Sequence, residues 1–151
     1  MPAEPAEVVL YTIGYEGRTP GNLVQALKAH EVRRVVDVRL QPVSRVKGFS
    51  LMALYEQLRK AGITYEHRKE LGNPREIRQL FHEGQLTEGR RRFRALLANG
   101  NGGAVDVLVG LARIEPTAIL CRERTAATCH RAIVADLAVE RSATKLRIEH
   151  L

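Results

Sequence analysis

The residues best suited to chemistry lie in one run, Cys121-Arg-Glu-Arg-Thr-Ala-Ala-Thr-Cys129-His130-Arg131. It holds the chain's only two cysteines and joins an apolar, strand-like segment to a helical pattern. In parallel α/β proteins, ligands bind beyond the carboxyl ends of the strands, which is where such a junction lies. The run therefore predicts a site in which Cys121 or Cys129 supplies a reactive thiol and Glu123 or His130 moves the proton.

Cys129 has two interpretations. Thr128 is a good helix N-cap, which would leave the backbone N–H groups of residues 129–131 free at the positive end of the helix dipole. A cysteine in that position has a stabilised thiolate, and the free N–H groups would bind an anion. Cys129 also lies four residues before Ile133, on the apolar stripe of the helix, so it is also compatible with a small buried core residue.

Cys121 ends an apolar run, so its thiol either projects into a pocket, as in rhodanese-like and phosphatase-like loops, or is buried. A phosphatase-type loop needs an arginine six positions after the cysteine, and this chain has Ala127 there. The spacing therefore argues against a phosphatase loop. The rhodanese-like alternative, which needs mainly a ring of backbone N–H groups around the sulfur, stays open.

The same residues include side chains that could ligate a metal. Cys121, Cys129 and His130, with His67 or His150, would form a sulfur and nitrogen set that zinc accepts, but their spacing matches no common zinc signature, so we predict no metal. The turn at Gly14 lacks the GxGxxG of a dinucleotide site and the GK[ST] of a P-loop. The sequence identifies no cofactor.

Arginines in residues 39–49 could hold an anionic ligand, because the guanidinium group binds phosphate or carboxylate through paired hydrogen bonds. Arg39 directly follows a strand and is the better candidate, Arg45 is the second, and Lys47 is compatible with a solvated charge. Glu70 and Glu123 are the nearest carboxylates, each either a general base or an arginine's partner.

A second basic cluster, Arg90, Arg91, Arg92 and Arg94, could follow a phosphate backbone. No aromatic residues are interleaved to stack on bases, which favours a solvated helix face.

Composition limits the class of protein. The chain has 151 residues, 44% of them hydrophobic and 27% charged, as expected for one globular domain. The net charge of +7 is compatible either with an anionic partner such as phosphate, nucleotide or nucleic acid, or with composition alone. Two cysteines, no signal-peptide pattern and no apolar stretch of roughly 20 residues predict a cytoplasmic location and no membrane insertion.

Hydrophobic periodicity predicts the elements that position these residues. Strands are expected at residues 8–13, 34–38, 63–67, 117–121 and 145–151, and helices between them, with residues 99–103 as a flexible break. This alternation predicts an α/β fold, a Rossmann-like three-layer sandwich with a mostly parallel sheet of about five strands. We expect a disordered tail over residues 1–7 and a single domain over residues 8–151.

Several of these segments together resemble a family of small prokaryotic α/β proteins, the domain of unknown function 488 family (DUF488). The matching residues are Thr12-Ile-Gly-Tyr15 with Leu23 and Leu27, Val36-Asp-Val-Arg39 with Pro42, Ser44-Arg45 and Gly48-Phe49-Ser50, Gly62-Ile63, Tyr65, Leu71-Gly72, Leu120-Cys121, Glu123 and Cys129-His130-Arg131. The resemblance implies a Rossmann-like sandwich and no established activity. It implies one shared site containing Asp37, Arg39, Ser44, Arg45, Glu123, Cys129, His130 and Arg131, to which we add Tyr15 at the end of the first strand.

Two main hypotheses follow. In the first, the protein is an enzyme acting on a phosphorylated or nucleic-acid-related substrate, whose anion is held by Arg39, Arg45 and Arg131. In the second, it is a non-catalytic module that binds nucleotide or nucleic acid through the same residues. A scaffold whose Cys-His-Arg segment merely caps a helix is a third possibility. The sequence leaves open whether it is an enzyme, and its oligomeric state.

Overall fold

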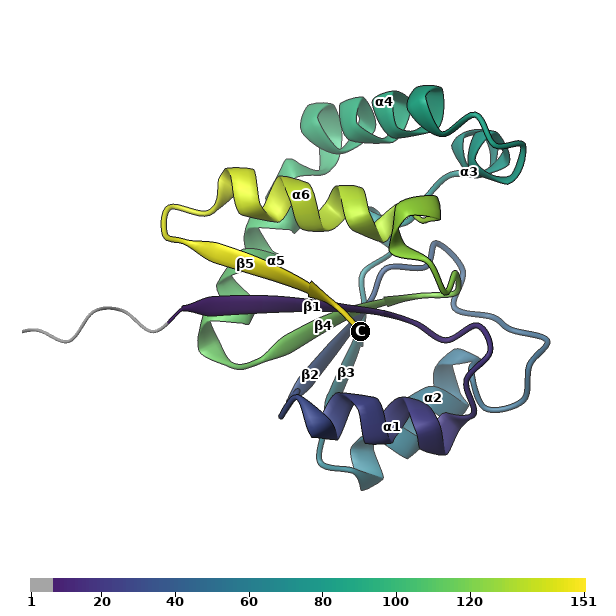
Figure 1. Ribbon diagram of the computed structural model, residues 1–151, viewed down its shortest axis with the longest axis vertical. Coiled ribbons are helices and arrows are strands. Elements are labelled where there is room, and N and C mark those ends of the chain that lie inside the picture. Colours follow the sequence, from purple (N-terminus) through teal and green to yellow (C-terminus); the bar gives the residue numbers. More distant parts are fainter. Residues whose placement is uncertain (1–6) are drawn as a thin grey trace, which may run out of the picture.

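A computed structural model describes residues 7–151, so the tail expected over residues 1–7 lies outside the described residues except for Glu7. The sheet has five parallel strands: β1 (Val8–Gly14), β2 (Arg34–Asp37), β3 (Thr64–His67), β4 (Thr117–Cys121) and β5 (Leu146–His150). Their order is β3-β2-β4-β1-β5 (Figure 1). The predicted parallel α/β fold is confirmed.

Burial explains the sequence of each strand. β4 lies at the centre of the sheet and all five of its residues are buried, which requires the uninterrupted apolar run that the sequence shows. β3 and β5 form the two edges, and their residues are largely half-buried or exposed.

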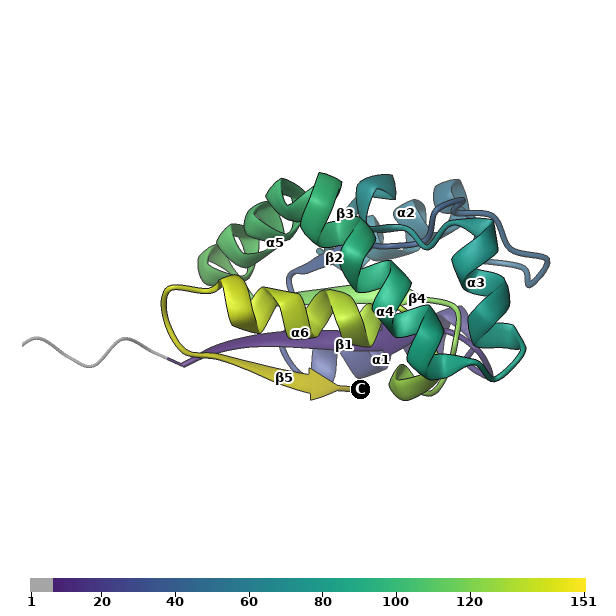
Figure 2. The same ribbon diagram turned by 90° about the horizontal axis from the view of Figure 1, so that it is seen from above.

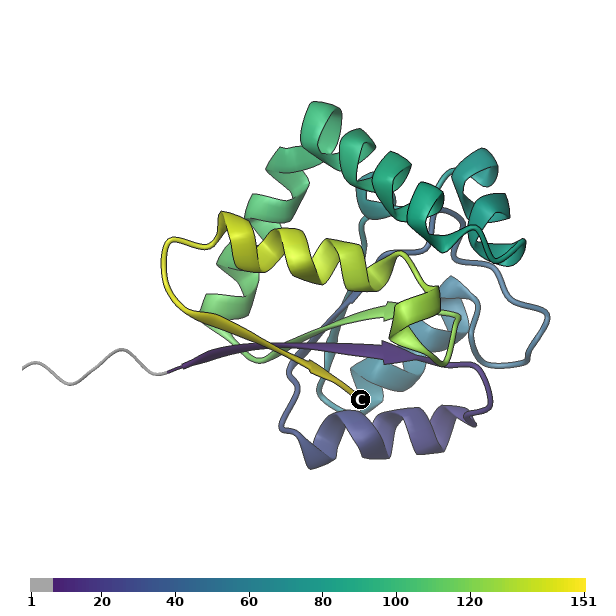
Figure 3. The ribbon, with the colours of Figure 1, turned by 45° about the horizontal axis from the view of Figure 1, so that its top comes forward.

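Helices cover both faces of the sheet and make three layers (Figures 1 and 2). One face carries α1 (Pro20–Ala29) and α2 (Leu51–Lys60), whose leucines join one core cluster. The other carries α5 (Gly102–Ile114) and α6 (Arg131–Arg141), which bury their apolar stripes in a second cluster. Two further helices complete this side: α4 (Leu86–Leu96) packs on α6, and α3 (Arg75–His82) packs on α4. The carboxyl ends of β1 and β4 point toward the side where α3 lies (Figure 3).

The flexible break predicted at residues 99–103 is wrong. A π-helical turn, Leu97–Asn101, continues α4 directly into α5. Leu97 is buried, and Asn101 donates a hydrogen bond to the carbonyl of Glu70 at 2.9 Å. A Cβ on Gly102 would lie 3.0 Å from the Arg141 guanidinium. The glycines of this segment therefore lie within continuous helix, which composition alone does not distinguish from a flexible loop.

The continuous helical segment Leu86–Ile114 is long and apolar enough to cross a membrane by length and composition. Core helices of soluble proteins pass the same test, so the indication is weak. In this fold Phe93, Leu97 and Leu108 pack into the cluster that includes α6, as in a soluble α/β domain.

Strand order brings the chemically suited residues together. The β1–α1–β2 connection leaves a gap between β1 and β2 that β4 fills, so Cys121 lies beside Gly14 and Leu120 beside Asp37. The segments that follow β1, β2 and β4 therefore start side by side, at the place where α/β sheets bind ligands.

Candidate functional site

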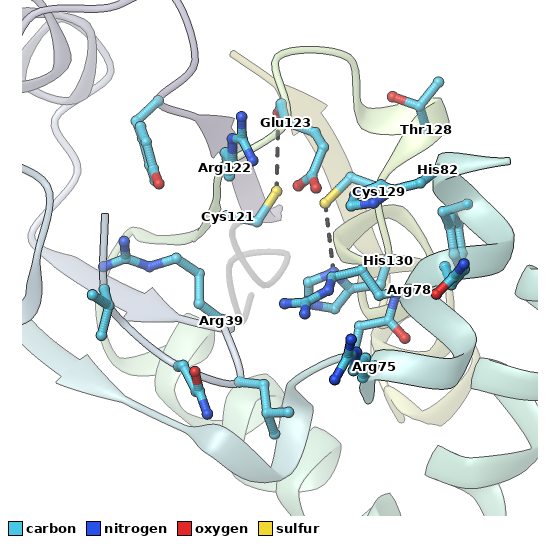
Figure 4. A pocket seen from close by; sticks show the side chains of 17 residues that line it. Arg39, Arg75, Arg78, His82, Cys121, Arg122, Glu123, Thr128, Cys129 and His130 are labelled. Atoms are coloured by element: carbon cyan, nitrogen blue, oxygen red, sulfur yellow. Dashed lines mark hydrogen bonds between the residues drawn. The ribbon is translucent and has the colours of Figure 1, made fainter. Parts of the chain in front are cut away.

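A pocket of about 410 Å³ lies where β1, β2 and β4 end, with residues of α3 and those just before α6 completing its wall (Figure 4). Six of the residues suggested by the sequence line it: Tyr15, Arg39, Cys121, Glu123, Cys129 and His130. Asp37 and Arg131 do not line the pocket, but each is bonded to residues that do. The predicted positions therefore converge on one cavity, with two exceptions described below.

The base of the pocket joins a thiol to a buried guanidinium group. Cys121 ends β4 and Arg131 begins α6, and Arg131 Nη1 donates to Cys121 Sγ at 2.9 Å. The other Arg131 donors bond the backbone carbonyls of Glu123 and Arg124 and the hydroxyl of Thr12. Because the side chain is fully buried and bonded to the protein, Arg131 supports the pocket instead of holding a ligand directly.

The positive charge of Arg131 is not neutralised by an ion pair with a described residue. Among residues 7–151, no carboxylate lies within ion-pair distance of Arg131. Burial lowers the pKa of the Arg131 guanidinium, but its electrostatic interactions and hydrogen bonds with the two cysteines, Cys121 foremost, raise it, and the net pKa is raised. A buried, permanent cation stabilises negative charge on the atom it touches, and that atom is the sulfur of Cys121.

Glu123 and Cys129 complete a compact cluster with Cys121. One ligand atom from each, the two sulfurs and a carboxylate oxygen, lie within 4.8 Å of one another. Burial raises the pKa of Glu123, but hydrogen bonds from its own backbone N–H and from Cys129 lower it, and the net pKa is lowered. The carboxylate is thus kept ionised beside two thiols.

Cys129 differs from the stabilised thiolate expected of it. Burial raises the pKa of its thiol well above the ordinary value, and the charges of Cys121 and Glu123 raise it further. Cys129 therefore stays a neutral thiol, and Cys121 is the sulfur better placed to carry charge.

The prediction that Thr128 caps the last helix is wrong. Residues Ala126–Thr128 form a 3₁₀ turn, and α6 begins only at Arg131 with His130 as its N-cap. The backbone of Cys129 is extended, which prevents the helix from starting there. Its N–H bonds the carbonyl of Ala126 at 3.0 Å, and the N–H of Arg131 bonds Cys129 Sγ at 3.4 Å. Two of the three N–H groups expected to bind an anion are therefore already occupied within the protein.

His130 is buried with its ring edge against Phe93. Its Nε2 lies 2.8 Å from the carbonyl of Val38, which can only accept, so Nε2 carries the proton. Burial lowers the pKa of His130, so the ring is neutral and Nδ1 can accept a proton from Cys129 Sγ, 3.6 Å away (Figure 4).

Arg39 is held rigidly at the pocket wall. Its guanidinium bonds both carboxylate oxygens of Asp37, and Nη1 donates to the carbonyl of Phe49 at 2.7 Å. The group also lies over the ring of Tyr15, 5.3 Å from its centroid. Asp37 is fully buried and also accepts a hydrogen bond from Tyr65 at 2.5 Å. This network fixes one cation in the wall of the pocket that Cys121 also lines.

Further basic residues of the pocket were not identified from the sequence. Arg75, Arg78 and His82 come from α3, and Arg122 follows Cys121 (Figure 4). Within residues 7–151, none of these three arginines forms an ion pair. The spacing 75, 78 and 82 places them on one helical face, a pattern that could have revealed a cationic stripe.

Ser44 and Arg45, expected in the shared site, do not line the pocket. Ser44 shapes its own loop, because its hydroxyl accepts from the N–H of Val46 while its backbone bonds Ser50. Arg45 is exposed.

A metal could be held by Cys121, Glu123 and Cys129, a sulfur and oxygen set suited to a thiophilic divalent cation. The histidines weighed as further ligands bond elsewhere: His67 bonds the carbonyl of Arg39, and His150 bonds Thr12. The absence of a metal remains a prediction.

The fold and pocket define a Rossmann-like α/β domain with thiol, carboxylate and guanidinium groups at the carboxyl ends of its central strands. The family described as domain of unknown function DUF488 matches residues 19–138, most of the chain. The protein belongs to this family, as the sequence resemblance predicted. No curated protein and no solved structure shows a significant match.

Proposed function

We propose that this protein is an enzyme with a thiol nucleophile, Cys121, acting on a phosphorylated or nucleic-acid-related substrate. The observation that carries the proposal is the contact between Cys121 Sγ and the buried Arg131 guanidinium, at the base of a pocket bordered by arginines. Thiol nucleophiles depend on neighbouring positive charge, which this contact supplies.

Substrate binding is assigned to Arg75, Arg78 and Arg122, which form no ion pairs with residues 7–151. Guanidinium groups suit the planar, paired hydrogen bonding of phosphate. The volume of about 410 Å³ falls in the range of sites that hold small molecules. A nucleotide-sized, negatively charged substrate fits both properties.

The reaction assigned to the site is nucleophilic displacement. The sulfur of Cys121 attacks the electrophilic atom of the substrate, so a bond from sulfur to substrate forms and the bond to the leaving group breaks. The Glu123 carboxylate accepts the thiol proton and passes it to the leaving group. A water molecule then attacks the bound substrate group, the bond to sulfur breaks, and the proton lost by the water restores the Cys121 thiol. A reduced thiol is required, which agrees with the cytoplasmic location that we also propose.

The test combines binding and turnover. Inorganic phosphate and a panel of nucleoside monophosphates are titrated by calorimetry into the wild type, Arg75→Ala with Arg78→Ala, and Arg45→Ala. We expect the double variant to bind at least about tenfold more weakly, since it loses charge-assisted hydrogen bonds, and Arg45→Ala to match the wild type. Cys121→Ser should retain binding and lose turnover of any processed ligand. Equal binding by all three proteins would contradict the proposed substrate class.

A non-catalytic binding module is the second candidate, and the burial of both sulfurs favours it. Cys121 and Cys129 are 0% and 2% exposed, so a substrate would need local movement to reach either thiol. In this alternative, the arginines bind the same ligands and Cys121→Ser changes neither affinity nor the chemical state of the ligand.

A further inference from the structure

We propose that Cys121 and Cys129 form an oxidisable dithiol pair, in which a hydroperoxide oxidises Cys121 and Cys129 then closes an intramolecular disulfide. This inference goes beyond the proposed function, because it needs no substrate of the pocket and holds equally for an enzyme or a binding module.

Proximity is the first support. Both cysteines are free, and their sulfurs lie within 4.8 Å of each other. A disulfide needs about 2.05 Å between the sulfurs, so a short approach is sufficient. Cys129 belongs to no helix, since it lies in extended backbone between a 3₁₀ turn and α6. Cys129 can therefore move toward Cys121 without unwinding a strand or an α-helix, while Arg131 keeps its bonds to the carbonyls of Glu123 and Arg124.

The two thiols have different surroundings, which assigns them different roles. Cys121 receives a hydrogen bond from the Arg131 guanidinium at 2.9 Å and is the sulfur on which negative charge is stabilised. Cys129 has the neutral imidazole Nδ1 of His130 at 3.6 Å, an acceptor for its proton when it reacts. Cys121 is thus the first thiol to be oxidised, and Cys129 is the resolving thiol.

Burial selects the class of oxidant. Both cysteines line the pocket, yet 0% of Cys121 and 2% of Cys129 is exposed. Oxidants as large as a peptide disulfide need a much wider opening of the site to reach such sulfurs. Hydrogen peroxide is close to water in size, so it needs the smallest opening of the site to reach these sulfurs.

The chemistry balances in two steps. The Cys121 thiolate attacks one peroxide oxygen, so an S–O bond forms, the O–O bond breaks and hydroxide leaves, taking a proton to become water. Cys129 then attacks the sulfenic sulfur, so the S–S bond forms and the S–O bond breaks. The departing hydroxide takes the Cys129 proton by way of His130 and leaves as water. The two thiols are oxidised by two electrons, and the peroxide is reduced to two waters.

The test uses the reduced, chelator-treated full chain with a small excess of hydrogen peroxide, followed by intact mass and peptide mapping. The wild type should lose the mass of two hydrogens through a Cys121–Cys129 disulfide, without forming dimers. Cys129→Ser should instead accumulate a sulfenic acid at Cys121, seen as one added oxygen in the intact mass and trapped by dimedone added together with denaturant. Cys121→Ser should be modified at Cys129 at least about tenfold more slowly. Thermal melting of each variant verifies that it is folded.

Three outcomes would overturn the proposal. The wild-type protein could stay reduced, or a disulfide could form only between chains. In the third outcome, Cys129 in Cys121→Ser is oxidised as fast as Cys121 in Cys129→Ser. The wild-type measurement stands even if a variant fails to fold. Since no pocket ligand is present, a failure here is distinct from a failure of the phosphate-binding experiments.

Discussion

Arg131 Nη1 lies 2.9 Å from Cys121 Sγ, although one residue begins α6 and the other ends β4. Arg131 has a structural role as well, because its guanidinium also bonds the carbonyls of Glu123 and Arg124 and so holds the segment that follows β4. One buried side chain thereby shapes the wall of the pocket and places positive charge beside its thiol.

Replacing Arg131 should therefore lower the stability of the fold. Arg131→Met leaves the carbonyls of Glu123 and Arg124 without their donor, and we expect it to lower the free energy of unfolding by roughly 3 to 5 kcal/mol. Urea denaturation measures this loss, with the exposed Arg45→Met as control. A loss below about 1 kcal/mol would show that the contact is not structural.

Gly14 should tolerate no side chain. A Cβ there would lie 1.8 Å from the backbone oxygen of Glu123, so Gly14→Ala must displace the segment that carries the site. We expect a destabilisation of about 3 kcal/mol or more, measured by thermal and urea denaturation.

Gly110 is the matched control for that substitution. It lies within α5, is exposed, and has open space where an added methyl group would lie, so Gly110→Ala should stabilise by roughly 0.5 to 1 kcal/mol. Similar effects at the two glycines would contradict the close approach at Gly14.

His130 should make stability depend on pH. Burial lowers its pKa in the folded state, so the unfolded chain binds the proton first as pH falls. Its contribution to stability is complete above the ordinary value of 6.5 and is lost as pH falls below that value toward the folded pKa. Denaturation between about pH 5 and 7 should show a smaller slope in His130→Gln, whose amide can still donate to Val38. An unchanged slope would mean that His130 is protonated equally in both states.

Asn73 should show a conflict between stability and binding. It lines the pocket with 4% exposure, and its Oδ1 has no hydrogen-bond partner among the residues the structure describes. Asn73→Leu removes this acceptor, so the free protein should gain up to about 1 kcal/mol while affinity for nucleoside monophosphates falls. Asn99→Leu, on an exposed turn, should change neither quantity. Weaker stability with unchanged affinity would oppose a binding role for Asn73.

Hydrophobic periodicity was sufficient to predict the strands and the edge of the sheet where the candidate pocket lies. Apolar runs such as residues 117–121 are what a central parallel strand needs, and their carboxyl ends had to share one edge. The role of Arg131 could not be predicted in this way. Charged side chains are almost never fully buried, so an arginine beside a cysteine suggests a ligand contact, whereas here tertiary hydrogen bonds engage it inside the core.

The start of α6 and the cations of α3 were missed for related reasons. Capping preference favoured Thr128, but burying Arg131 and Cys129 requires extended backbone before the helix, and that tertiary demand prevails. Arg75 and Arg78 have the composition of a solvated helix face. Only the packing of α3 beside the ends of the central strands gives them a pocket to line.

The most direct measurement is the rate at which Cys121 is alkylated in Cys129→Ser by anionic iodoacetate relative to neutral iodoacetamide, in the folded protein and in urea. A thiol within a cation-bordered pocket predicts a higher iodoacetate-to-iodoacetamide ratio in the folded protein, and a lower ratio when Arg75→Ala and Arg78→Ala are added. A ratio that is the same folded and unfolded, or that ignores the two arginines, would contradict the account of Cys121 as a reactive thiol in an anion-binding pocket.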